Sequence, residues 1–86
     1  MIMNEIENYK QIIRQELETE KDKDINADER KIRRLTNFFR LDEGDQNIFI
    51  LYFINGTKYN RIAKMMNVYP ELIKKQITRI EKLLEQ

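Results

Sequence analysis

The sequence predicts an all-α domain of four to five helices, with a helix-turn-helix at the C-terminal end and an amphipathic helical arm at the N-terminal end. Three observations support this. Apolar residues recur at steps of three and four along most of the chain, which is the period of an α-helix. Only two Gly and one Pro interrupt the pattern. The length of 86 residues allows one small core rather than two.

The first helix is predicted over about Met3 to Lys21 from an apolar stripe at Ile2, Ile6, Tyr9, Ile13 and Leu17. The stripe is narrow and the other faces of the helix are charged. Residues 1–24 therefore form an arm that either packs on the rest of the domain or pairs with a second copy. The second alternative makes a homodimer interface of Ile6, Tyr9, Ile13 and Leu17.

A polar break follows the arm, and it contains alternating acidic and amide side chains from Asp22 to Asp28. The spacing is similar to that of a calcium loop, but Ala27 stands where such a loop needs Gly and Arg33 where it needs Glu. We expect no metal. Asn26 and Glu29 fit a capping box instead, which predicts a second helix over about Ala27 to Arg40.

The second helix is expected to bury Ile32, Leu35, Phe38 and Phe39. A third, capped by Asp42, is predicted over about Glu43 to Asn55 and contains the apolar run Ile48–Ile54. Periodicity alone also allows a buried strand here, but no partner strand is evident. The run is far below the roughly 20 residues that a membrane-spanning helix needs, so we expect no membrane interaction.

Turn residues divide the last part of the chain into two further helices. Gly56 is predicted to end the third helix in a left-handed conformation, and Thr57 to cap a short helix over about Lys58 to Met66. Asn67 suits a left-handed turn and Val68 an apolar plug behind it. Pro70 then opens a helix to about Leu84 with a buried stripe at Ile73, Ile77, Ile80 and Leu84. The predicted core contains Phe38, Phe39, Leu51, Ile62, Met66, Val68, Ile73 and Ile77.

Charge is distributed unevenly although the net charge is only +1. Residues 1–29 carry four basic and nine acidic side chains, whereas residues 30–86 carry twelve basic and six acidic ones. The chain has no His, Cys, Ser or Trp, so the usual proton shuttle, nucleophiles and thiolate metal ligands are missing. We therefore expect no enzyme activity and no cofactor, in a soluble protein of the bacterial cytoplasm.

Residues 25–86 are predicted to form the helix-turn-helix domain, and within it Leu41 to Leu84 resemble region 4 of sigma-70-type transcription factors. Leu41-Asp42-Glu43 stands where that family has Leu-Pro-Glu, and Gly56–Ala63 is similar to its Gly-x-Ser-Tyr-x-Glu-Ile-Ala. Met66-Asn67-Val68 replaces Leu-Gly-Val. No counterpart of sigma region 2 is present. The arrangement of arm and C-terminal domain resembles small phage transcription activators of the ArpU/RinA type.

The helix-turn-helix order predicts that the last helix enters the major groove of double-stranded DNA. The expected base contacts are Tyr69, Glu71, Leu72, Lys74, Lys75, Thr78 and Arg79. The expected phosphate contacts are Lys58, Arg61, Lys64, Arg33, Arg34 and Arg40. The resemblance implies that Glu71 accepts a hydrogen bond from cytosine. Tyr69 is expected to cap the last helix poorly. The apolar group of Tyr69, Pro70 and Leu72 either contacts thymine methyl groups or docks on a protein.

The leading interpretation is a DNA-binding transcription regulator encoded by a phage or mobile element. The alternative is a protein-binding module that uses a sigma-like domain to inhibit or recruit RNA polymerase or another transcription regulator. A small terminase subunit, which also binds DNA and oligomerises through a helix, is a third and weaker alternative. The target site and the sign of regulation do not follow from the sequence.

Overall fold

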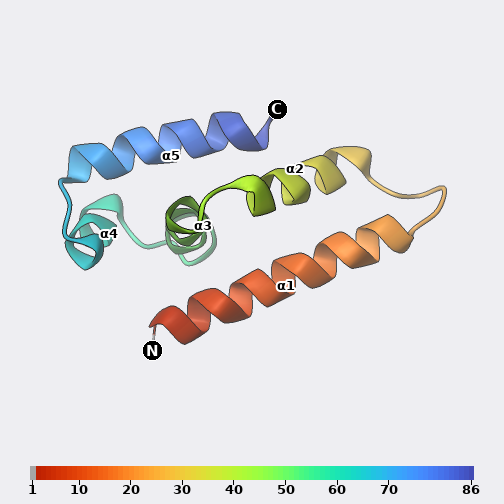
Figure 1. Ribbon diagram of the computed structural model, residues 1–86, viewed down its shortest axis with the longest axis horizontal. Coiled ribbons are helices and arrows are strands. Elements are labelled where there is room, and N and C mark those ends of the chain that lie inside the picture. The colour runs from red at the N-terminus through yellow and green to blue at the C-terminus, as the bar shows by residue number, and fades with distance from the viewer. Residues whose placement is uncertain (1) are drawn as a thin grey trace.

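The computed structural model describes residues 2–86, with side chains from residue 4 onward. It contains helices α1 (Ile2–Asp22), α2 (Glu29–Arg40), α3 (Glu43–Phe49), α4 (Tyr59–Met66) and α5 (Pro70–Leu84), and a π-helical segment η1 (Ile50–Ile54). Residues 2–86 form no strand, so the predicted all-α class is confirmed and the strand alternative for residues 48–54 is wrong. In Figure 1, α2 and α3 lie between α1 on one side and α5 on the other.

The core is built largely from isoleucine and leucine, and its largest fully buried side chains are Phe38, Ile50, Ile62, Ile73 and Ile80. The predicted stripe on α5 is confirmed, because Ile73, Ile77, Ile80 and Leu84 are all buried. Phe39 and Val68 are partly buried against this cluster. Met66, predicted to lie in the core, is 36% exposed. It is the last residue of α4, and the left-handed turn at Asn67 brings Val68 to the core instead.

Helix α1 packs on α2 and η1 of its own chain. Its side chains Ile6, Ile13 and Leu17 are buried, and Tyr9 is partly buried. The first of the two predicted alternatives therefore describes this chain: residues 4–22 are part of the domain and share its core. Because Ile6, Ile13 and Leu17 are buried within their own chain, they are not exposed for the homodimer interface that the second alternative describes, and that alternative stays a prediction. The side chain of Ile2, and Met1 as a whole, lie outside the described residues.

The start of α2 differs from the predicted capping box of Asn26 and Glu29. Asp28 is the capping residue, and its Oδ1 accepts hydrogen bonds from the backbone N–H groups of Arg30 and Lys31 at 3.1 and 3.2 Å. The position of Asp28 is fixed from α1, because its own N–H donates to Oε2 of Glu20 at 3.0 Å. Helix α2 begins two residues later than predicted. The sequence around residue 28 does not indicate this start, because the contact that fixes Asp28 comes from a different helix.

The third predicted helix begins at its expected cap, with Asp42 Oδ1 accepting from Asp45 N–H at 2.8 Å, but changes type after Phe49. The N–H of Asn55 donates to the carbonyl of Ile50 at 2.9 Å, which closes a turn one residue wider than an α-turn. The wide turn moves Ile54 off the buried face, and Ile54 is 40% exposed. Ile50 and Leu51 both remain in the core.

Glu20 is a buried carboxylate that joins α1 to the start of α2. The N–H of Asp28, donating to Glu20, holds the pKa of this carboxyl below its ordinary value of 4.5, with support from Lys23 and Lys31 against the opposing effect of burial. A lowered pKa in the folded state stabilises the fold above the unfolded-state value and loses that effect as pH falls through the folded value. Glu20 therefore stabilises the fold at neutral pH, and this contribution declines as the pH falls from about 4.5 through the lower pKa of the folded state.

We expect Glu20→Gln to lower the free energy of unfolding at neutral pH and to reduce the further loss that acid causes. Urea denaturation at neutral pH and at about pH 3 measures both effects. Glu16→Gln, which changes an exposed carboxylate of the same helix, is the matched control. Identical acid sensitivity of the Glu20→Gln variant and the wild type would contradict the assignment.

Candidate nucleic-acid interface

Helices α4 and α5 are joined by a tight turn at Asn67, which has the predicted left-handed conformation with φ 58° and ψ 48°. The N–H of Val68 donates to the carbonyl of Ala63 at 2.9 Å, which closes the turn. Ala63 is 1% exposed, and Ile62 beside it is fully buried. A small residue at position 63 lets α4 and α5 approach closely. The predicted helix-turn-helix is therefore present.

The caps of these two helices follow the sequence only in part. Gly56 has the predicted left-handed conformation, with φ 71°. Thr57 does not cap α4: Lys58 holds the cap position without a side-chain hydrogen bond, while Thr57 Oγ1 lies 3.4 Å from the Asn55 amide that donates to it. Tyr69 precedes α5 without a side-chain capping bond, as predicted.

The surface of α5 opposite the buried stripe carries most of the predicted base contacts. Glu71, Lys75 and Thr78 are exposed there, about one helical turn apart. The Thr78 hydroxyl donates to the carbonyl of Lys74 at 3.2 Å. The ammonium of Lys74 lies 5.0 Å from the ring centroid of Tyr59 and so is held toward α4 by a cation–π contact. At the leading end of the helix, Tyr69 is 82% exposed and Leu72 is 44% exposed.

Arg79 differs from the other predicted base contacts because its guanidinium is bound within the chain. Its Nη2 forms an ion pair with the carboxylate of Asp45 on α3, and its Nε donates to Oε1 of Gln76 at 2.9 Å. The Asp45 side chain is only 7% exposed, whereas that of Arg79 is 51% exposed. This pair ties α5 to α3. Arg79 therefore helps to hold the helix in place, and its predicted role as a base contact stays a prediction.

The six predicted phosphate contacts are exposed but fall into two groups. Lys58, Arg61 and Lys64 lie at or on α4, which packs on α5. Arg33, Arg34 and Arg40 lie on α2, which runs beside the far end of α5 (Figure 1). Arg34 is paired with Glu85 at 3.5 Å, and Arg30 shares the same carboxylate at 3.4 Å. The six residues therefore lie on or next to two different helices that both pack on α5, and Arg34 is already paired within the chain.

Sequence reasoning missed the polar side chains that fix the far end of α5 and the α2–α3 corner. The Asn37 amide, on α2, donates to the carbonyls of Leu84 and Gln86 at 3.1 and 3.3 Å. The Gln46 amide donates to the carbonyls of Phe38 and Leu41 at 3.3 and 3.1 Å. Asn37 and Asp45 are both buried. The bonds of Asn37 join segments that are remote in sequence, and those of Gln46 lie across the corner between two helices. No local sequence pattern predicts either set.

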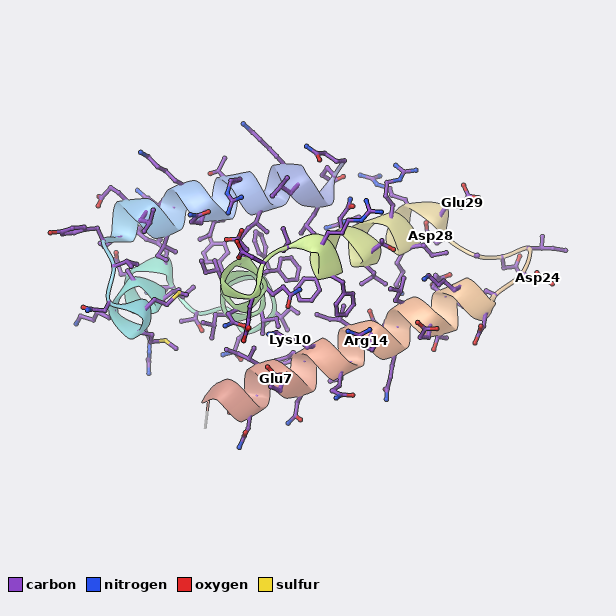
Figure 2. All side chains as sticks on the ribbon, viewed as in Figure 1. Glu7, Lys10, Arg14, Asp24, Asp28 and Glu29 are labelled. Atoms are coloured by element: carbon purple, nitrogen blue, oxygen red, sulfur yellow. The ribbon has the colours of Figure 1, made fainter. Side chains whose placement is uncertain are left out.

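The acidic helix α1 does not lie on the outward face of α5. It is on the far side of α2 and η1, as Figure 1 shows. Two of its basic side chains are turned inward (Figure 2): Arg14 lies 4.5 Å from the ring centroid of Phe39, and Lys10 pairs with Glu7 at 3.5 Å. Arg14 stays exposed and Glu20 is buried, so the exposed surface of α1 keeps the net negative charge of its composition.

Replacing Arg79 with Met should lower the free energy of unfolding by about 1–3 kcal/mol, because Asp45 would stay buried without its cation. The double change Asp45→Asn with Arg79→Met should recover part of that loss, since no buried charge remains. Urea denaturation of the two variants and of Asp45→Asn alone completes the cycle. Strictly additive effects would show that the pair does not hold α5 to α3.

Comparison with known proteins adds no assignment: no family model, no curated protein and no solved structure matches this chain. None of the helices in residues 2–86 is long and apolar enough to cross a membrane.

Proposed function

We propose that this protein is a DNA-binding regulator of transcription that inserts α5 into the major groove, with a domain similar to sigma-70 region 4. The observation that carries the proposal is the outward face of α5, whose exposed Glu71, Lys75 and Thr78 are held in place by a buried isoleucine stripe behind them. In a helix-turn-helix, the N-terminal part and outward face of the second helix reach the base edges. A phage or mobile element is the proposed source, by the resemblance to small phage activators.

Charge supports DNA as the partner. Helices α4 and α5 together carry six basic and two acidic side chains, whereas α1 carries six acidic and three basic ones. Because α1 is on the far side of the domain from α5, a polyanion is attracted to one side and repelled from the other. This gradient orients the domain with α5 toward DNA before any base is contacted.

The two kinds of contact are divided among the helices. Lys58, Arg61 and Lys64 neutralise phosphates beside the entry point of α5 and set its orientation, whereas base edges set the sequence that is preferred. Lys75 is the central base contact, since Lys74 is held over Tyr59 and Arg79 is bound by Asp45.

The test uses a duplex that the wild-type protein selects from a random pool. We expect Lys75→Ala to weaken the free energy of binding to this duplex by about 1–3 kcal/mol, the effect of losing one base contact. Lys75 is exposed and lies outside the core, so the variant should fold as the wild type does. Fluorescence anisotropy at several salt concentrations measures the affinity and its salt dependence.

The matched control is Lys21→Ala, which removes one exposed lysine from the end of α1 and should change the affinity little. Failure of the wild type to select or bind any duplex at low salt would overturn the proposed function. Equal losses in the two variants would show that only general charge matters and that α5 does not read bases.

A second candidate is a module that binds RNA polymerase or another transcription regulator, and exposed apolar side chains outside α5 favour it. Phe53 and Ile54 on η1 are 41% and 40% exposed, although they belong to the most apolar segment of the chain. Phe53→Glu should abolish such an interaction and leave DNA binding unchanged. Pull-down from a bacterial lysate treated with nuclease, followed by identification of polymerase subunits, separates the two functions.

A further inference from the structure

A hollow of about 270 Å³ lies between α1 on one side and α2 and α3 on the other. It is lined by Glu7, Lys10, Gln11 and Arg14 of α1, Phe39 of α2 and Gln46 of α3. Figure 2 shows Lys10 and Arg14 on the side of α1 that faces these two helices. Pockets for drug-sized molecules occupy roughly 300–1,000 Å³, so this hollow is suited to a smaller group.

Lys10 and Arg14 place two positive charges in this hollow. They are four residues apart on α1 and so are neighbours on one face, where like charges repel each other. The Lys10 side chain is only 14% exposed, yet its sole ion-pair partner among residues 4–86 is Glu7, at 3.5 Å. An ammonium group has three hydrogen-bond donors, and this contact uses one of them. The ammonium of Lys10 therefore has donors for a second anion.

Arg14 is fixed in orientation by an aromatic ring. Its guanidinium carbon lies 4.5 Å from the ring centroid of Phe39, and it forms no ion pair among residues 4–86. Stacking occupies one face of the guanidinium and leaves the N–H donors at its edge, which match two oxygens of a phosphate group. Gln46 borders the hollow and is fixed as well, because its amide donates to the carbonyls of Phe38 and Leu41. The hollow thus holds a stacked guanidinium beside a largely covered ammonium.

The charges and donors of the lining favour an oxyanion as the occupant. Lys10 and Arg14 against Glu7 leave a charge of +1 on the six lining residues. A phosphate group presents three acceptor oxygens and carries about −1.5 to −2 charges at neutral pH. Arg14 can bind two of these oxygens along its edge, and Lys10 the third. The side chain of Glu7 is 59% exposed, so it can turn into water when another anion takes its place.

We propose that this hollow binds a phosphate group, carried by the free ion or by a small phosphorylated molecule, with Arg14 and Lys10 as its ligands and Glu7 as the side chain that it displaces. The site does not rest on the proposed function. A duplex along the outward face of α5 would lie on the opposite side of the domain, since α1 is on the far side of α2 and η1. An anion bound here links α1 to α2 and α3 in the folded chain alone, and it therefore stabilises the fold.

Two probes test the site: inorganic phosphate, and glycerol phosphate, in which the same group is esterified. Each is titrated at constant ionic strength into the isotope-labelled protein, while NMR follows the backbone amides and the Nε–H of Arg14. Saturable shifts are expected at Arg14 and at the amides of Lys10 and Phe39. Tighter binding of glycerol phosphate would support the site and assign it to a phosphomonoester. Tighter binding of inorganic phosphate would support it and assign it to the free ion.

Variants separate this site from general attraction of anions. Lys10→Met and Arg14→Gln should each weaken phosphate binding about tenfold, the effect of losing one charge-assisted hydrogen bond. Glu7→Gln should tighten it severalfold, because the competing carboxylate is removed. The control Lys75→Ala removes an exposed cation from α5 and should leave the affinity for phosphate unchanged.

Shifts that do not saturate, or equal losses in Lys10→Met and Lys75→Ala, would overturn the inference, because the anion would then be attracted by net charge alone. Unchanged or weaker binding by Glu7→Gln would also overturn it. This variant changes an exposed side chain outside the core, so it tests the site even where Lys10→Met disturbs the packing of α1. None of these results depends on whether α5 binds DNA, which the selected duplex tests separately.

Discussion

The burial of one side of α5 is the constraint on which the candidate interface depends. Ile73 and Ile80 are each at most 1% exposed, and Ile77 and Leu84 complete a continuous apolar stripe. Because this side is fixed in the core, the helical period places the opposite side of α5 in solvent. The ion pair of Arg79 with Asp45 then fixes the helix laterally against α3. Orientation of the outward face is therefore a property of the core, and not of the exposed residues themselves.

The sequence was sufficient for several features that depend on a few adjacent residues, although the predicted cap at Thr57 is not one of them. The left-handed conformations of Gly56 and Asn67 follow from the backbone preferences of those residues, and the cap at Asp42 from its own side chain. The prediction of a capping box at the start of α2 was wrong, because Asp28 is the cap and its position is fixed by Glu20 of another helix. The wide turn at η1 was not predicted for a related reason: a uniformly apolar segment has no periodicity that indicates the type of turn.

The candidate site shows the same division. Exposure of Glu71, Lys75 and Thr78 follows from the period of α5 and was predicted. The ion pair of Arg79 with Asp45 was not predicted. The two residues are 34 positions apart, and the sequence around each of them does not indicate that they meet. The apolar stripe of α1 was recognised correctly, but amphipathicity alone does not say whether a helix covers its own domain or a second copy.

Tyr69 and Leu72 contribute little to holding the domain together: neither belongs to the core, and Tyr69 does not cap the helix that it precedes. Mutation can therefore change this surface in many ways without unfolding the protein. Arg79 and Asp45 have no such freedom, since changing Arg79 alone leaves the buried Asp45 carboxylate without its cation. In evolutionary terms the leading end of α5 is open to drift and selection, whereas its middle is constrained. A lineage of such proteins can diverge in what it recognises while its scaffold stays the same.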